Sequence, residues 1–330
     1  MLRSETADAP ERLAAALRGL RVYQQAPRGE AAAPPPEIAR VGRACLRDYG
    51  GSGRPILFVP SLINPPDVLD LDAERSLLRW LATRGVRPLL LDWGAPAADE
   101  TDLDISGHVE RLLLPLIAAI GEPPVLAGYC LGGTMAVAAA QLAPVRALAL
   151  IATPWHFGHY PAEDRIALAE LWREAGPVTD ALGLLPMDLL QAAFWRLDPG
   201  RTVAKFERLG MDPPTEEALR AFVRLEDWAN DGPPLTRGAA RDLFEGFYAT
   251  DLPGSGQWRV GGATIEADRL DMPVLEIAST TDRIVPHASA VGIGTRLDLA
   301  LGHVGMIVGG RARSHLWEPL AAWLSDLPGS

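Results

Sequence analysis

The chain carries the stretch GYCLGG at residues 128–133, and this stretch decides the fold. A short apolar run at residues 124–127 precedes it, and an alanine-rich stretch at 134–140 follows it with the composition of a helix. Glycines allow a turn too tight for larger side chains, and they leave one reactive group, the thiol of Cys130, at the apex. The sequence therefore predicts a strand, a sharp turn that presents a thiol, and a helix.

This order of elements is typical of the nucleophile elbow of the α/β-hydrolase fold, in which most members carry serine at the apex. Cys130 would lie at the N-terminus of the following helix, where the helix dipole and free backbone N–H groups favour a thiolate. The backbone N–H of Leu131 is then expected to receive a developing oxyanion. We expect the second donor to be the backbone of Leu62, in the loop after the first buried strand.

Strand and helix patterns alternate on both sides of the elbow. Such repeats predict a mostly parallel sheet with helices on both faces, built from residues 46–153 and 269–330. The expected strands are 56–59, 88–91, 124–127, 147–151, 273–278 and 296–301, and the expected helices are 74–84, 106–120 and 315–324.

Two further parts are expected outside this core. Residues 1–45 read as a peripheral segment with a proline-rich linker at 34–36. Residues 154–268 contain many of the tryptophans and helical patterns separated by Pro and Gly, which predicts an inserted helical cap. Its expected helices are 166–174, 188–196, 216–229 and 239–249.

The partners of Cys130 are found by chain order, because α/β-hydrolases place the acid and then the histidine after the nucleophile. Asp282 follows a predicted strand, and His303 follows the last one. Both would lie at the carboxyl ends of strands, where an open α/β sheet places its site. Asp92, at the end of an earlier strand, is the alternative acid.

Other chemistry-bearing residues are weaker candidates. His156 and His159 stand at the start of the cap and could line a pocket, but no acid at a strand end is in register with them. The histidines show no metal-ligand spacing with the cysteines or carboxylates, so neither a metal nor a cofactor is expected. Cys45 reads as a structural residue. The remaining histidines are His108, His287 and His315.

The bulk composition excludes several classes of protein. The 330 residues are 48% apolar and 22% charged, and their net charge of −11 argues against a nucleic-acid binder. No run approaches the ~20 apolar residues of a membrane span. The N-terminus lacks an apolar signal core, and two cysteines form no disulfide framework, so a cytoplasmic protein with free thiols is expected.

A cysteine nucleophile bears on the reaction. In a Cys–His–Asp triad, His303 takes the thiol proton and Asp282 orients the imidazole. The acyl-enzyme is a thioester, so transfer from another thioester is close to thermoneutral and transfer onward to an alcohol is downhill. The thiol therefore favours acyl transfer to a hydroxyl, provided that the cap excludes water.

These residues resemble those of the polyhydroxyalkanoate synthases, specifically the short catalytic subunit of the two-subunit type. The resemblance extends over roughly residues 49–324 and is most specific at the elbow. The similar segments are 59–64, 70–76, 91–94, 128–134, 225–228, 244–248, 282–286 and 302–306.

The resemblance implies that an (R)-3-hydroxyacyl-CoA acylates Cys130 with help from His303, and that the 3-hydroxyl of the next unit attacks while Asp282 helps to activate it. It also implies a homodimer, a second synthase subunit and the surface of a polymer granule as partners. Two positions depart from the family pattern: Arg283 stands where many members have His, and His156 where the short type usually has Asp.

Two alternatives remain open at this point. The first is a hydrolase that uses the same thiol, such as a thioesterase, an esterase or a polyhydroxyalkanoate depolymerase-like paralogue. The second is a non-enzymatic granule-associated scaffold with a relict site. The first differs from a synthase in whether water reaches the acyl-enzyme.

Overall fold

The computed structural model describes residues 5–6, 9–29, 33–197, 199–212 and 214–328. The chain divides into two units. The larger comprises residues 34–187 and 232–330, and the smaller comprises residues 188–231 with the N-terminal segment up to residue 33.

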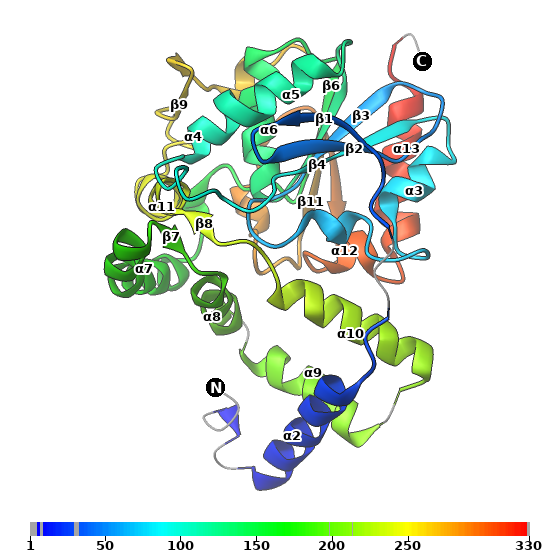
Figure 1. Cartoon of the computed structure of the whole chain (residues 1–330), viewed down its shortest axis with the longest axis vertical. Helices are drawn as coiled ribbons and strands as arrows, with labels where there is room; N and C mark the ends of the chain where they lie inside the picture. Colours follow the sequence, from blue (N-terminus) through cyan, green and yellow to red (C-terminus); the bar gives the residue numbers. More distant parts are fainter. Residues whose placement is uncertain (1–4, 7–8, 30–32, 198, 213, 329–330) are drawn as a thin grey trace. The chain divides into compact units, whose positions relative to one another are not determined.

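An eight-stranded sheet forms the centre of the larger unit (Figure 1). Its strands are β1 (Glu37–Val41), β2 (Ala44–Asp48), β3 (Pro55–Val59), β4 (Arg87–Asp92), β5 (Val125–Tyr129), β6 (Ala147–Ile151), β11 (Val274–Ser279) and β12 (Thr295–Leu299). Their order is β1-β2-β4-β3-β5-β6-β11-β12. β2 runs antiparallel to its neighbours, and from β4 to β12 all pairs are parallel. The predicted α/β-hydrolase class is confirmed.

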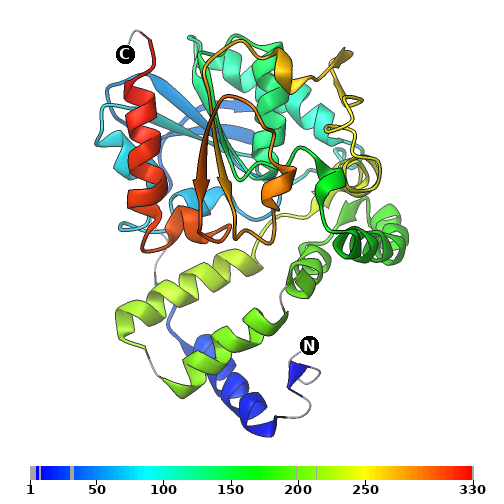
Figure 2. The ribbon, with the colours of Figure 1, turned by 180° about the vertical axis from the view of Figure 1, so that it is seen from behind.

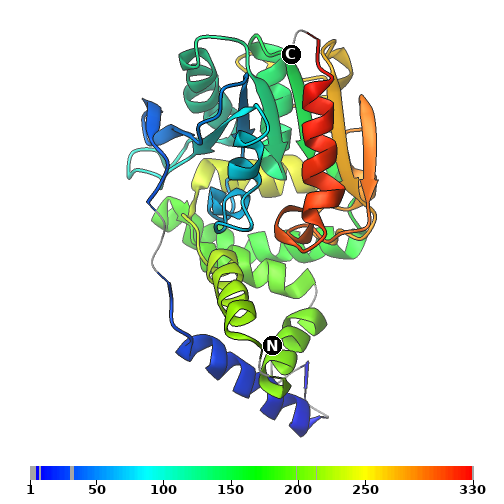
Figure 3. The same cartoon turned by 90° about the vertical axis from the view of Figure 1, so that its right-hand side faces the viewer.

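Helices cover both faces of this sheet (Figure 3). One face carries α3 (Leu77–Ala82) and α13 (Glu318–Ser325); the other carries α4 (Ile105–His108), the π-helical turn η2 (Val109–Leu113), α5 (Leu114–Ala119) and α6 (Leu131–Leu142). Since both faces are covered, β3, β5, β6 and β11 are buried along their whole length. That burial explains why these strands read as continuous apolar runs.

The first two strands lie where the sequence predicted a peripheral segment. β1 and the start of β2 fall within residues 1–45 but belong to the sheet. β1 is an edge strand with a mostly exposed, charged sequence, so it lacks the apolar run by which the buried strands were recognised. The core of the fold therefore begins earlier in the chain than residue 46.

The opposite edge of the sheet is formed by β12, next to β11 (Figure 2). Short helical elements lie in the segments that follow the strands: η1 (Pro66–Leu69), η6 (His287–Ser289), α12 (Gly305–Val308) and η7 (Arg313–Trp317). The predicted last strand, 296–301, is two residues shorter at its end than expected, because residues 300–303 turn to bring His303 to the edge of the sheet.

The predicted cap is divided between the two units. Residues 154–187 and 232–268 belong to the larger unit. They form η3 (Phe157–His159), α7 (Ala162–Leu182), β7 (Leu184–Leu185), β8 (Leu235–Thr236), α11 (Arg237–Arg241), η4 (Asp242–Ala249), β9 (Arg259–Val260), β10 (Ala263–Thr264) and η5 (Ala267–Arg269). α7 runs beyond the expected 166–174 and ends at Gly183, whose φ of 72° provides a left-handed C-cap.

The smaller unit is helical. Its elements are α2 (Pro10–Gln25), α8 (Met187–Leu197), α9 (Pro199–Met211) and α10 (Glu216–Asn230). α2 packs closely on α9 because both helices carry glycine at the crossing: a Cβ on Gly19 would lie 1.9 Å from Phe206 O, and one on Gly210 would lie 2.0 Å from Ala15 O. Ala16, Val203 and Phe206 form the buried core of this crossing.

A membrane-spanning helix is not found among the described parts of the chain, since none of their helices is both long and apolar enough to cross a bilayer.

Candidate active site

The elbow has the backbone strain expected of a nucleophile turn. β5 ends at Tyr129, α6 begins at Leu131, and Cys130 between them has φ 55° and ψ −131°. A side chain other than glycine is rarely held at positive φ, so the surroundings must enforce this conformation. The Cys130 N–H donates to Ile151 O at 2.9 Å, and Cys130 O accepts from the Gly133 N–H at 2.8 Å.

The glycines of the elbow are required by close packing. A Cβ on Gly132 would lie 2.1 Å from Val59 O, and one on Gly133 would lie 1.9 Å from Thr153 Oγ1. A Cβ on Gly128 would lie 2.3 Å from the Cα of Gly133. These distances are well below van der Waals contact, so only glycine lets β5 turn into α6 at this point.

The structure brings His303 and Asp282 together. Asp282 is 8% exposed and His303 is 9% exposed, and Oδ2 of Asp282 lies 2.7 Å from Nδ1 of His303. Oδ1 of Asp282 accepts from the N–H groups of Ile284 at 2.8 Å and Val285 at 3.0 Å. Because the carboxylate can only accept, the Nδ1–H of His303 donates to it.

The Cys130 side chain also affects the protonation of His303. Burial by itself lowers the pKa of His303, but the charges of Asp282 and of a Cys130 thiolate, and hydrogen bonds to both, raise it to about 10. The opposing effects show that the two anionic partners outweigh desolvation. At neutral pH the imidazole of His303 is therefore protonated beside the carboxylate of Asp282.

Tyr129 forms one wall of this group. Its ring stacks on the ring of His303 with centroids 5.0 Å apart, and its hydroxyl donates to His303 O at 3.3 Å. The residue that precedes the thiol thus positions the imidazole, a role that the sequence motif did not indicate.

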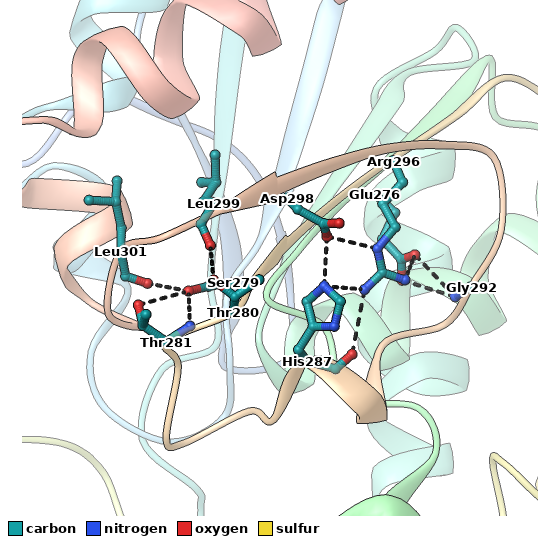
Figure 4. A network of polar contacts seen from close by, with 10 residues as sticks. All are labelled: Glu276, Ser279, Thr280, Thr281, His287, Gly292, Arg296, Asp298, Leu299 and Leu301. Atoms are coloured by element: carbon teal, nitrogen blue, oxygen red, sulfur yellow. Dashed lines mark hydrogen bonds and ion pairs between the residues drawn. The ribbon is translucent and has the colours of Figure 1, made fainter.

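Hydrogen bonds join residues 279–281, which precede Asp282, to residues 299–301, which precede His303 (Figure 4). The Ser279 hydroxyl donates to Leu301 O, two residues before His303, and accepts from the Thr281 N–H at 3.1 Å. The Thr280 N–H donates to Leu299 O at 2.8 Å. Sequence reasoning missed Ser279, whose only signal was its place in the polar run before Asp282.

A second part of the network in Figure 4 holds the segment that follows the acid. Glu276, 2% exposed, accepts from the Gly292 N–H at 3.1 Å and from Arg296 at 3.2 Å. Arg296 also donates to Asp298 at 2.9 Å, and Asp298 lies 2.7 Å from His287. His287, one of the weaker candidates, is therefore engaged at the outer edge of the sheet.

The two residues expected to form the oxyanion hole lie on adjacent segments. Leu131 is the first residue of α6, so its N–H has no acceptor within the helix. Leu62 is buried in the loop after β3, and the carbonyls of Val59 and Pro60 at the start of that loop lie against Gly132. Their role as oxyanion donors stays a prediction.

The other candidates are held elsewhere. Asp92 pairs with Arg47 at 2.9 Å. His108 is buried, accepts from Arg43 at 2.6 Å, and its pKa is lowered to about 4, chiefly by burial. Cys45 is 1% exposed, and burial raises its pKa.

The rings of His156 and His159 stack on each other, with centroids 5.2 Å apart. Where residues are described, no cluster of three or more His, Cys, Asp or Glu side chains could hold a metal ion.

Comparison with curated proteins identifies relatives of one kind. The chain is 30% identical over 293 residues to the poly(3-hydroxyalkanoate) polymerase subunit PhaC of Haloferax mediterranei, a match that covers 82% of this chain and 58% of that protein. It is 28% identical to the subunits of the same name from Synechocystis and Allochromatium vinosum, of which it covers 78% and 81%. The chain thus spans about three fifths of the Haloferax relative. No family model matches it.

Solved structures with the same fold are α/β-hydrolases of low sequence identity. The enol-lactonase from Burkholderia xenovorans superimposes with a TM-score of 0.52 at 17% identity, covering 88% of this chain and 100% of that one. An esterase from Thermogutta terrifontis superimposes with a TM-score of 0.51 at 16% identity, covering 89% and 99%. At this identity the likeness establishes the fold alone.

Proposed function

This chain is a homologue of the poly(3-hydroxyalkanoate) polymerase subunits on an α/β-hydrolase fold, and from that premise we propose that it is an acyltransferase that polymerises (R)-3-hydroxyacyl-CoA. The observation that carries the proposal is a strained elbow with Cys130 at its apex in a chain that also pairs a buried His303 with Asp282. A thiol stands at the elbow where a hydrolase would ordinarily carry serine.

Acylation begins from the thiolate and imidazolium. The sulfur of Cys130 attacks the carbonyl carbon of the acyl-CoA, and the developing oxyanion is received by the backbone N–H groups of Leu131 and Leu62. The carbon–sulfur bond to CoA then breaks, and the CoA thiolate takes the proton of His303. The product is an acyl thioester on Cys130, with a neutral His303 held by Asp282.

Elongation returns the site to its starting state. The 3-hydroxyl of a second hydroxyacyl unit attacks the Cys130 thioester and gives its proton to His303. The new ester bond forms as Cys130 leaves as a thiolate, which regenerates the ion pair. Exchange of a thioester for an oxygen ester is downhill, so no external energy source is needed.

The runner-up is hydrolysis through the same thiol. The two reactions share Cys130, His303 and Asp282 and differ in whether water or a hydroxyacyl unit accepts the acyl group. Exclusion of water from the acyl-enzyme is what the synthase requires and the hydrolase does not.

Incubation with (R)-3-hydroxybutyryl-CoA tests the proposal. Released CoA is measured with a thiol reagent, and the acyl product is separated into polymer and free acid. Polymer formed alongside CoA is the expected result, and free acid alone would rule out the synthase. Cys130→Ala is expected to abolish CoA release, and Cys45→Ala is the matched control that retains it.

The proposal extends to partners and place. We propose an acyl-CoA substrate, a homodimer, a second synthase subunit and a cytoplasmic polymer granule as the setting, and no metal or cofactor in catalysis. Sedimentation of the chain alone, and after mixing with a candidate second subunit, tests the assembly. Turnover that survives a metal chelator tests the last point.

A further inference from the structure

The indole of Trp93 connects two segments that meet at the elbow. Trp93 follows β4 and is buried, and its Nε1–H donates to Pro60 O at 3.0 Å. It lies within residues 91–94, one of the segments that resemble the synthases. The acyl-transfer steps proposed for this site leave Trp93 without a role, yet its hydrogen bond ends at the loop that follows β3.

The carbonyl that accepts this hydrogen bond lies against the first turn of α6. A Cβ on Gly132 would lie 2.5 Å from Pro60 O and 2.6 Å from Pro60 C. Both atoms belong to the peptide that joins Pro60 to Ser61, and Gly132 comes two residues after Cys130. Trp93 therefore holds a peptide that packs against the elbow itself.

This peptide leads directly to Leu62, one of the two expected oxyanion donors. The Ser61 hydroxyl accepts from the Ile63 N–H at 3.1 Å, which folds residues 61–63 into a turn. Leu62 is buried, and among the described residues its N–H has no hydrogen-bond acceptor. Buried N–H groups without an acceptor are rare. This N–H is therefore available to a bound group, as is that of Leu131 at the start of α6.

Arg43 holds the backbone of Trp93. It lies between β1 and β2, and its guanidinium donates to Trp93 O at 2.5 Å and to Gly94 O at 2.8 Å. Its side chain is mostly buried, and its Nε–H donates to Glu100 at 2.9 Å. Because the N–H groups of a guanidinium lie in one rigid plane, this cation fixes two successive carbonyls at once.

His108 supports the same guanidinium. Nη2 of Arg43 lies 2.6 Å from Nε2 of His108, and because arginine can only donate, Nε2 accepts. The Nδ1–H of His108 therefore donates to Asp104 O at 2.7 Å. The His108 ring also packs edge-on to the Trp93 ring, with centroids 5.8 Å apart. Trp93 is thus held through its backbone by Arg43 and through its ring by His108, which gives the indole N–H a fixed direction.

We propose that Trp93 is a positioning residue for acyl transfer, which holds the Leu62 N–H at the distance from Cys130 that an oxyanion requires. Its indole fixes the peptide after Pro60 against Gly132, and Leu62 follows that peptide. A donor stabilises an oxyanion only when it is already in place where the charge develops, so a shift of this loop weakens acylation without altering the thiol. The inference rests on the proposed acylation of Cys130.

The first test compares two reactions of the same thiol in Trp93→Phe. Attack on (R)-3-hydroxybutyryl-CoA passes through an oxyanion, whereas alkylation by iodoacetamide does not. The first-turnover rate of CoA release at saturating thioester is expected to fall about 10–100-fold. The thioester concentration that gives half the maximal rate and the rate at which iodoacetamide labels Cys130 are expected to stay unchanged. Trp80→Phe is the matched control with both rates unchanged, because among the described residues Nε1 of Trp80 has no hydrogen-bond partner to lose.

A second variant changes the support of the indole. Arg43→Lys keeps a positive charge beside Glu100, but a single amine cannot span both carbonyls and reach His108 as well. We expect this variant to lower CoA release relative to iodoacetamide labelling, but by less than Trp93→Phe does, because the indole N–H remains. Urea unfolding establishes that each variant is folded.

The outcomes separate this inference from the proposed function. An unchanged ratio of the two rates in folded Trp93→Phe overturns the inference, and so does an equal fall in both rates, which would show that the indole only stabilises the elbow. If Trp93→Phe does not fold, an unchanged ratio in Arg43→Lys overturns it instead. Each of these results leaves polymer formation by the wild-type protein standing. Free acid in place of polymer would overturn the synthase alone, and a wild-type protein that releases no CoA would overturn both.

Discussion

Nδ1 of His303 lies 2.7 Å from Oδ2 of Asp282, and both side chains are buried at the carboxyl edge of the sheet. The carboxylate's other oxygen is occupied by two backbone N–H groups, so the contact has one geometry rather than several. This pair fixes the tautomer of His303 and leaves its other nitrogen for the thiol. Most of the reactivity expected of the site depends on it.

Replacing Asp282 by Asn should lower the rate of CoA release by about 10²–10⁴-fold. The charge that raises the pKa of His303 is lost, and burial then favours the neutral imidazole, so Cys130 loses its cationic partner. The rate of CoA release and the rate of iodoacetamide labelling at pH 7 should fall together. Asp298→Asn, at the outer edge beside His287, is the matched control, and an equal loss there would contradict the assignment.

The raised pKa of His303 predicts a pH dependence of stability. A group whose pKa rises from 6.5 to about 10 on folding contributes stabilisation that is complete below pH 6.5. That stabilisation is lost as the pH rises toward 10. The free energy of unfolding in urea should therefore differ most between wild type and His303→Gln near pH 6, and the difference should shrink with rising pH. A difference that stays constant over this range would contradict the charged state of His303.

The two thiols should differ sharply in reactivity. Cys45 is 1% exposed, burial raises its pKa, and it lies in β2 of the sheet. Cys130 is partly exposed and lies at the N-terminus of α6. Peptide mapping after brief iodoacetamide treatment should find the label on Cys130, and both thiols should react in concentrated urea. Fast labelling that persists in Cys130→Ala would show that the reactive thiol is Cys45.

Gly132→Ala should destabilise the protein by about 1–3 kcal/mol or more. The added Cβ would lie 2.1 Å from Val59 O and 2.5 Å from Pro60 O, which are backbone atoms that cannot rotate away. Gly310→Ala is the matched control, because a Cβ there meets nothing within 4 Å. Urea unfolding measures both, and equal stability of the two variants would mean that the elbow is not packed as described.

Asp251→Ala should weaken the link between η3 and η4 by about 1–3 kcal/mol, because the N–H groups of Phe157 and Gly254 lose their acceptor. Asp251→Asn keeps an acceptor oxygen and tolerates the φ of 52°, so it should retain most of the stability. An equal loss in Asn and in Ala would show that the negative charge, rather than the hydrogen bonds, is what matters.

Much of the fold could be predicted because its evidence is local. β3, β5, β6 and β11 are buried on both faces, so each appears in the sequence as an uninterrupted apolar run. β1 is exposed at the edge and gives no such run, so its sequence is that of a peripheral segment. α9 was not predicted either, and its packing partner α2 lies nearly two hundred residues earlier in the chain.

The nucleophile, acid and histidine could be proposed from their order along the chain, since parallel strands bring their carboxyl ends to one edge. The supporting residues could not. Ser279 reaches Leu301 through a hydroxyl bond between two loops, and Tyr160 meets Tyr248 because η3 and η4 pack together. Neither pair has a spacing or a motif that marks it in the linear sequence.

By itself, the sequence determined the strand, the strained glycine turn and the thiol at its apex, because these depend on residues adjacent in the chain. It also determined the order of Cys130, Asp282 and His303. Only the tertiary structure decided which groups support His303: Tyr129, which stacks on its ring, and Ser279, which donates to Leu301 O. These contacts join segments far apart in sequence, and burial, backbone carbonyls and neighbouring charges acquire their effect only when the chain has folded.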